Sequence, residues 1–166
     1  MRRLALVTTL ALAAMLDGGC KCSRGGTGGG ASTGASASAA VKKNVGKPRV
    51  LASSQNGPFG IASDGHDVYW TNKGKRKQDG AVMKVARAGG TPVVLVDGLS
   101  TPYGIVVDAA NVYWTEYDSP QKMELGSVRR LALACGATVT LAEAVPTPWS
   151  IAVHGDSVFF TTLLGH

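Results

Sequence analysis

The sequence has 166 residues and a formal net charge of +6, but only 17% of its residues are charged and the positive excess is scattered. Nucleic-acid binders usually gather Lys and Arg on one element, so no nucleic-acid partner is expected. Three cysteines do not make a disulfide framework, and no pair of Cys or His has the spacing of a zinc site.

Residues 1–19 are predicted to be an export signal. Two arginines precede an apolar run at residues 4–16, which is shorter than the roughly 20 residues needed to span a membrane. The small residues before Cys20 resemble a bacterial lipoprotein cleavage box, although Asp17 stands where Leu is usual. This resemblance implies lipidation of Cys20 and a place in the cell envelope, in the periplasm or at the outer membrane. Ordinary secretion and an uncleaved anchor are the alternatives.

The next segment, residues 20–46, is predicted to be a flexible linker. It consists mainly of Gly, Ser, Ala and Thr, which cannot bury enough apolar surface to offset the entropy lost on ordering. The linker would join a membrane-proximal anchor to a folded domain at residues 47–166.

The folded domain contains an internal repeat. The blocks are PFGIASDGHDVYWTN at 58–72, PYGIVVDAANVYWTE at 102–116 and PWSIAVHGDSVFFTT at 148–162. Each full unit contains four short runs rich in Val, Ile, Tyr, Trp and Thr, separated by turns with Gly, Pro or Asp. In the first unit these predicted strands are residues 60–63, 68–72, 81–87 and 93–96. Four strands in a unit of about 45 residues predict a propeller blade.

Side chains alternate across a strand, and both faces of a blade are covered by neighbouring blades. Successive residues of each aromatic block are therefore expected to face opposite neighbours. The aromatics predicted to form the structural core of the repeat are Tyr69, Trp70, Tyr113, Trp114, Phe159 and Phe160.

These blocks resemble those of the YWTD and NHL group of β-propellers. The matching residues are YWT at 69–71 and 113–115 and the pattern P-[FYW]-[GS]-I at 58–61, 102–105 and 148–151. The resemblance covers about residues 47–162. The fourth position of YWTD is Asp in the family but Asn72, Glu116 and Thr162 here, so no role of that Asp is carried over.

The predicted fold is all-β: a partial β-propeller of about two and a half four-stranded antiparallel blades, after a signal helix and a disordered linker. Residues 47–58 align with residues 91–102 and are expected to begin with an outermost strand. Propellers close with 4 to 8 blades. We therefore expect an N-terminal fragment of a longer propeller, with missing blades, or the assembly of other copies into a ring.

The loops at residues 73–79, 97–101, 117–125 and 143–147 are expected to share one face, where variable loops on a rigid scaffold usually carry function. The candidate binding residues are Lys73, Lys75, Arg76, Lys77, Tyr117 and Asp118. The plain alternative is a solvated, charged loop. His66 and His154 are expected in surface turns of the opposite face.

No catalytic or metal-binding residue and no cofactor is assigned from the sequence. The prediction is a non-catalytic binding or scaffold module with a protein or extracellular ligand. The alternative is part of a propeller enzyme: similar repeats occur in lyase and lactonase-like groups that use His or Glu with a divalent metal. Because the inner strands here are small and apolar, such a site would lie in missing blades. Cys135 is either a small turn residue or a reactive or bridging thiol.

Overall fold

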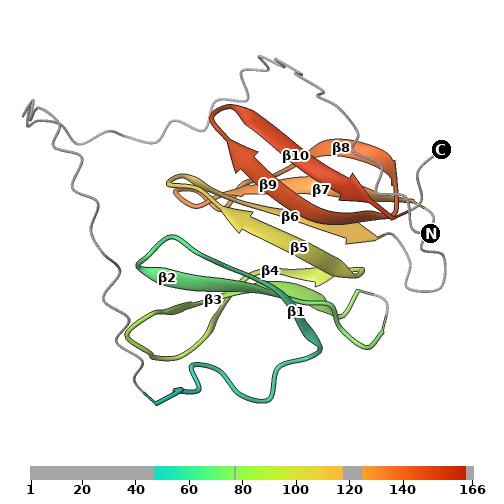
Figure 1. Ribbon diagram of the computed structural model, residues 1–166. Helices are drawn as coiled ribbons and strands as arrows, with labels where there is room; N and C mark the ends of the chain where they lie inside the picture. Colours follow the sequence, from blue (N-terminus) through green and yellow to red (C-terminus); the bar gives the residue numbers. More distant parts are fainter. Residues whose placement is uncertain (1–46, 77, 118–124, 164–166) are drawn as a thin grey trace, which may run out of the picture.

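The computed structural model describes residues 47–76, 78–117 and 125–163. The predicted export signal, the linker and Cys20 lie outside the described residues. Within these residues ten strands form three antiparallel sheets (Figure 1). The first blade is β1 (Pro58–Ser63), β2 (Asp67–Asn72), β3 (Gly80–Ala86) and β4 (Val93–Leu99); the second is β5 (Pro102–Val107), β6 (Asn111–Tyr117), β7 (Leu125–Ala132) and β8 (Thr138–Pro146); the third is β9 (Pro148–His154) and β10 (Ser157–Thr162).

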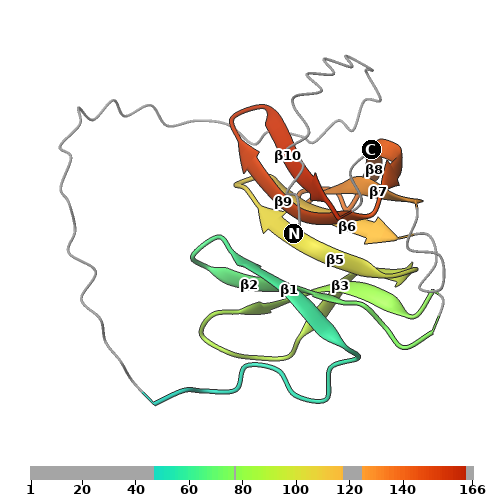
Figure 2. The ribbon, with the colours of Figure 1, turned by 45° about the vertical axis from the view of Figure 1, so that its right-hand side comes forward.

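Each sheet is a meander in which consecutive strands pair. The three blades stack as layers, with the innermost strands β1, β5 and β9 side by side (Figure 2). This arrangement confirms the predicted all-β fold and its partial propeller architecture. In the part of the chain that the structure describes, no helix has the length and hydrophobicity to span a membrane.

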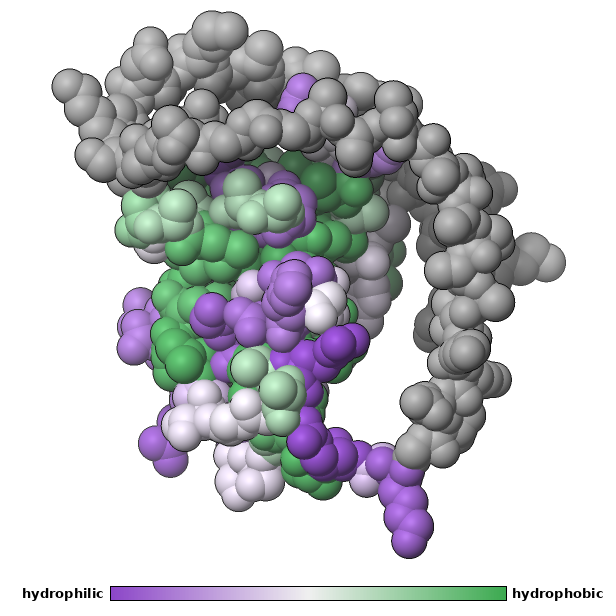
Figure 3. Space-filling model, turned by 90° about the vertical axis from the view of Figure 1, so that its left-hand side faces the viewer, coloured by the Kyte–Doolittle hydropathy of each residue, from purple (hydrophilic) through white to green (hydrophobic). Residues whose placement is uncertain are grey.

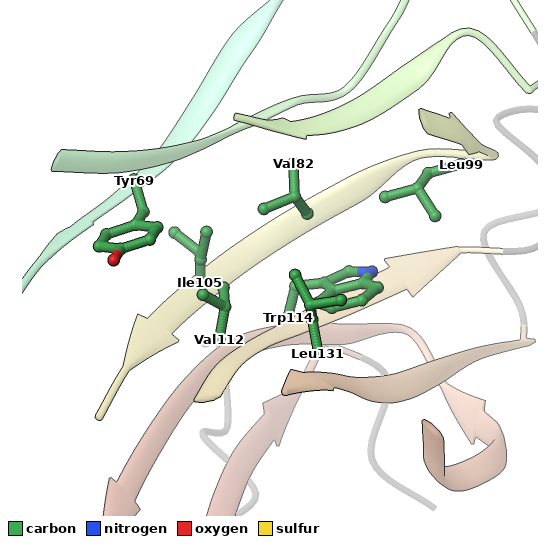
Figure 4. Close-up of a cluster of buried hydrophobic side chains, with 7 residues drawn as sticks. All are labelled: Tyr69, Val82, Leu99, Ile105, Val112, Trp114 and Leu131. Atoms are coloured by element: carbon green, nitrogen blue, oxygen red, sulfur yellow. The ribbon is translucent and has the colours of Figure 1, made fainter. Parts of the chain in front are cut away.

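The largest apolar core lies between the first and second blades (Figure 4). Tyr69 and Val82 of the first blade pack against Ile105 and Trp114 of the second. Trp114 is fully buried, and such a side chain contributes about 1.5–3 kcal/mol relative to exposure. Trp70 points away from this core into a smaller cluster, as strand alternation requires.

The Thr of each YWT block joins one blade to the next. Thr71 Oγ1 accepts a hydrogen bond from the N–H of Gly60 in its own blade at 2.9 Å and donates to the carbonyl of Tyr103 in the next blade at 2.7 Å. Thr115 repeats this arrangement with Gly104 and with the carbonyl of Trp149, at 2.9 and 3.0 Å. Both threonines are fully buried, so these bonds form without competition from water.

Glycine allows the close approach that these bonds need. A Cβ atom on Gly60 would lie 2.3 Å from the carbonyl oxygen of Tyr103, and one on Gly104 would lie 2.6 Å from that of Trp149. Neither distance is compatible with a side chain. The inner strands of adjacent blades can therefore pack together only where this position is glycine.

A carboxylate–tyrosine pair fixes the β1–β2 and β5–β6 turns. Asp64 accepts hydrogen bonds from the N–H groups of His66 and Asp67 and from the hydroxyl of Tyr69, which lies 2.9 Å away. The Asp67 and His66 N–H groups lower the pKa of Asp64, with a smaller contribution from Tyr69. Burial and the bond to Asp64 raise the pKa of Tyr69.

The same pair recurs in the second blade. Asp108 accepts from the N–H groups of Ala110 and Asn111 and from the Tyr113 hydroxyl at 2.8 Å. Burial alone would raise the pKa of Asp108, but these hydrogen bonds outweigh it and lower the pKa.

The third blade departs from the repeat at each of these positions. Ser150 replaces the glycine, His154 replaces the turn Asp and Phe159 replaces the Tyr. Thr161 still accepts a hydrogen bond from the N–H of Ser150, at 3.1 Å. Phe159 is 45% exposed, whereas its counterpart Tyr69 is 2% exposed, so the outward face of the third blade is uncovered in the structure.

The segment that precedes β1 is not the outermost strand that the sequence alignment predicts. Residues 47–57 form no strand, and Leu51 instead packs against the Trp70 cluster. Gln55 Oε1 accepts hydrogen bonds from Trp70 Nε1 and from Asn72 Nδ2, both at 3.0 Å. A fourth strand needs a third strand beside it, and the described residues offer none here. The segment covers Trp70, which is only 7% exposed, but it does not cover Ile61, which is 74% exposed.

Candidate functional site

The loops that follow β2 and β4 meet the end of β6 on one face of the stack, on the right in Figure 1. They surround a hollow of about 230 Å³, which we call the loop-face hollow. Its lining includes Lys73, Lys75, Arg76, Thr101, Tyr103 and Tyr117. Residues from the first and second blades thus build one concave surface.

Aromatic rings form the inner wall beside this hollow. The rings of Phe59, Tyr103 and Trp149 all contact one another, with centroids 4.5 Å (Phe59–Tyr103), 4.9 Å (Tyr103–Trp149) and 5.4 Å (Phe59–Trp149) apart. Tyr103 also makes a T-shaped contact with Tyr117 at 4.7 Å. Phe59, Tyr103 and Trp149 occupy the same repeat position, directly after the Pro that opens each unit. Because β1, β5 and β9 lie side by side, this position places one aromatic ring per blade at the loop-face end of the inner strands.

Tyr117 is fully buried, and its hydroxyl is one of the buried polar atoms without a hydrogen-bond partner in the described structure. Burial, with a contribution from Tyr103, raises the pKa of Tyr117 to about 12. The phenol is therefore neutral at physiological pH and keeps its proton available for donation. A buried hydroxyl without a partner is costly, so it marks a position where a ligand atom would be favourable.

The basic side chains around the hollow belong to the β2–β3 loop. Lys73 Nζ lies 6.0 Å from the centre of the Phe59 ring, and Lys75 and Arg76 are exposed. Asp79 closes this loop by accepting from Asn56 Nδ2 at 2.6 Å and from the N–H of Lys75 at 3.2 Å. These contacts lower the pKa of Asp79 and occupy its carboxylate.

The acidic residue that ends the second YWT block, Glu116, does not line this hollow. Glu116 lies in β6, where its carboxylate accepts from the N–H of Ser100 at 2.9 Å and from Trp114 Nε1 at 3.2 Å. Arg129 binds the same carboxylate at 3.2 Å. Glu116 and Arg129 line a separate hollow of about 460 Å³ on the second blade, in which their charges compensate each other.

The structure brings together four of the six candidate binding residues, namely Lys73, Lys75, Arg76 and Tyr117. Lys77 and Asp118 lie outside the described residues. The loop at residues 97–101, which contributes Thr101, was expected on this face, but Tyr103 was not among the candidate binding residues, although an aromatic follows the opening Pro of each unit.

Other residues considered from the sequence lie elsewhere. His66 and His154 are exposed in the short turns of the opposite face, where hydrophobic and hydrophilic residues are mixed (Figure 3). Cys135 is exposed in the β7–β8 turn, and its N–H donates to the carbonyl of Ala132. Among the described residues, no three His, Cys, Asp or Glu lie close enough to hold a metal ion.

The aromatics of the repeat core divide between covered and uncovered positions. Tyr69, Trp70, Tyr113 and Trp114 are buried, whereas Phe160 is partly buried and Phe159 is exposed. The difference follows from the neighbours: the second blade lies between two blades, residues 47–57 cover Trp70 on the first blade, and nothing in the described structure covers the outer face of the third.

Comparison with known proteins identifies the fold but no family. No protein-family model matches the chain, and no curated protein matches it. Among solved structures, it is similar to a β-propeller chain in the crystal structure of a nidogen/laminin complex, with a TM-score of 0.54 and 24% sequence identity. The match covers 65% of this chain and 41% of that chain. The likeness shows the fold: the three sheets correspond to part of a β-propeller.

Proposed function

We propose that this chain is an exported, membrane-tethered β-propeller of the YWTD or NHL type, which serves as a non-catalytic binding or scaffold module for another protein. The observation that carries the proposal is the loop-face hollow, where the β2–β3 loop, Thr101 and the aromatic wall converge from two blades. Variable loops on a rigid sheet scaffold are a common location of binding sites. The similar solved structure contains a protein–protein complex, which agrees with this proposal.

The site chemistry favours binding over catalysis. In the alternative, a propeller lyase or lactonase, acidic or imidazole side chains would project from the loop-face ends of the inner strands. Those ends carry Phe59, Tyr103 and Trp149 instead. These rings supply contact area and stacking, and none of the three residues is a carboxylate or an imidazole.

Export and tethering complete the proposal. Cys20 would carry the lipid, and the linker would hold the blades away from the membrane. Further blades of a longer propeller, or other copies of the chain, would cover the exposed end faces marked by Ile61 and Phe159. Large exposed apolar patches are unusual on monomeric soluble proteins.

Photo-crosslinking from single positions in the full chain tests the binding proposal. A photoreactive residue at Arg76, which lines the hollow, should trap one defined protein in the cell envelope. The same residue at Ala109, which is exposed in the β5–β6 turn of the opposite face, is the matched control. Equal products from both positions, or none from Arg76, would refute a binding role for the loop face.

A further inference from the structure

The loop-face hollow is electrostatically unbalanced. Three cationic side chains, Lys73, Lys75 and Arg76, line it. The two ion pairs within 4 Å found in the described part of the chain join Lys84 to Asp67 and Arg129 to Glu116, so neither involves the hollow. The nearby Asp79 accepts hydrogen bonds from Asn56 Nδ2 and from the N–H of Lys75, and its charge also interacts with Arg76. Three cations beside one carboxylate leave a net positive charge at the hollow.

A directional hydrogen-bond donor accompanies this charge. Tyr117 is one of the residues that line the hollow, and its buried hydroxyl has no hydrogen-bond partner in the described structure. The Tyr103 ring packs edge-on against the Tyr117 ring and helps to fix its position. A neutral donor next to cationic side chains favours an oxygen anion, because hydrogen bonds to charged acceptors are stronger than those between neutral groups.

The size of the hollow limits what can enter. Pockets that enclose a drug-sized molecule measure about 300–1,000 Å³, whereas this hollow measures about 230 Å³ and is bordered by exposed residues. It has room for the end of one side chain whose polypeptide stays outside. The aromatic wall of Tyr103 and Tyr117 would contact the aliphatic part of such a side chain.

We propose that the loop-face hollow binds the carboxylate of an Asp or Glu side chain presented by a partner protein. This inference rests on the proposed binding function and names the chemistry of the partner. The Tyr117 hydroxyl donates to one carboxylate oxygen, while Arg76 and Lys75 neutralise the charge at the rim. Lys73, held near the Phe59 ring, supplies the third cation.

Titration of the full chain with poly-L-glutamate tests this proposal. Trp149 lies 4.9 Å from Tyr103, so its fluorescence should report occupancy, and Trp149→Phe should remove that signal while calorimetry still detects binding. Tyr117→Phe removes only the hydroxyl and should weaken the affinity about tenfold. The same change should leave the stability to denaturant unchanged or raise it, because an unpartnered buried polar atom is lost. A purely structural Tyr117 would not give these two results together.

Two further variants separate a specific site from general attraction to a basic protein. Arg76→Ala should weaken binding several-fold, whereas Arg87→Ala removes the same charge from an exposed position near the β1–β2 turn and should not. Equal losses in both variants, or unchanged affinity in Tyr117→Phe, would overturn the carboxylate site. If Arg76 still crosslinks a protein in that case, the binding function stands and only the ligand chemistry fails. Stronger binding of inorganic phosphate or free glutamate than of the polymer would also overturn the proposal.

Discussion

At the scale of single residues, the threonines of the YWT blocks matter most for the stack. Thr71 and Thr115 each satisfy an N–H group in one blade and a carbonyl in the next. The aromatics beside them fill space, but filling space does not specify how far apart two sheets lie. The hydroxyl does, because its two hydrogen bonds fix the distance between adjacent inner strands.

Thr71→Val should destabilise the protein by about 1–3 kcal/mol, because it leaves the buried N–H of Gly60 and the carbonyl of Tyr103 without their partner. Chemical denaturation followed by circular dichroism measures the effect. Thr140→Val, at an exposed position on β8, is the control and should change little. A Thr71→Val protein as stable as the control would refute the interblade role of the hydroxyl.

The Asp64–Tyr69 and Asp108–Tyr113 pairs should make stability depend on acid. Both carboxylates have pKa values below the ordinary 3.8 in the folded protein. As pH falls, the unfolded chain therefore takes up these protons first, and the stability contributed at neutral pH is lost below about pH 4. Denaturation midpoints between pH 6 and pH 3 should fall less steeply in an Asp64→Asn, Asp108→Asn double variant. Parallel slopes for the variant and the wild type would contradict this assignment.

At the scale of elements, each inner strand of the two complete blades needs a Pro at its start and a Gly two residues later. Pro102 and Pro148 begin their strands in fully buried positions, and the ladder is irregular just after Pro102. Two residues further on, the strand must accept the approach of its neighbour, and only glycine allows this at Gly60 and Gly104. The outer strands carry no such constraint, since β4 and β8 are exposed or half-buried at all but one residue each.

Gly60→Ala should be destabilising by about 1–3 kcal/mol or more, because the added Cβ meets a backbone carbonyl that cannot move without separating the blades. The matched change in the third blade is Ser150→Ala, which stands at the same repeat position on an uncovered face. Thermal unfolding should show a large loss for Gly60→Ala and almost none for Ser150→Ala. Equal melting temperatures for the two variants would mean that the blades do not approach as the structure shows.

The repeat made the strands predictable, because alternation and turn residues recur in each unit. The four strands expected in the first unit agree with β1–β4 to within a few residues. The segment at residues 47–57 was predicted wrongly because alignment with residues 91–102 cannot reveal whether a partner strand exists. Strand formation at an edge depends on the neighbour, which local sequence does not encode.

The candidate site was only partly predictable for a related reason. The basic run pointed to the β2–β3 loop, and the polarity of Tyr117 pointed to the end of β6. The contribution of Tyr103 depends on the register between blades, and the burial of Glu116 depends on Arg129 across the ladder. Both features depend on tertiary contacts, which the residue pattern of a single strand does not reveal.

At the scale of the whole molecule, the stack has two unequal ends. The first end is partly covered by residues 47–57, with Ile61 left exposed, and the other end exposes Phe159. These two apolar surfaces correspond to the faces that meet inside the stack. We expect them to promote association when the protein is concentrated.

Phe159→Lys should reduce this association, because it places a charge on the uncovered face of the third blade without disturbing a buried contact. Sedimentation velocity over a range of concentrations measures the change. Val139→Lys, at a position of similar exposure on β8, is the control and should associate like the wild type. If both variants behave alike, the end face has no special role in association.

The double hydrogen bonding of the buried threonines also determines how the stack comes apart. When β2 separates from its neighbours, Thr71 loses both the N–H of Gly60 and the carbonyl of Tyr103 on the neighbouring inner strand. That strand in turn contains Gly104, which Thr115 holds while it bonds Trp149 in β9. Unfolding of one blade thus removes hydrogen bonds from the inner strand of the next, so the blades should unfold together in one cooperative transition and not one at a time.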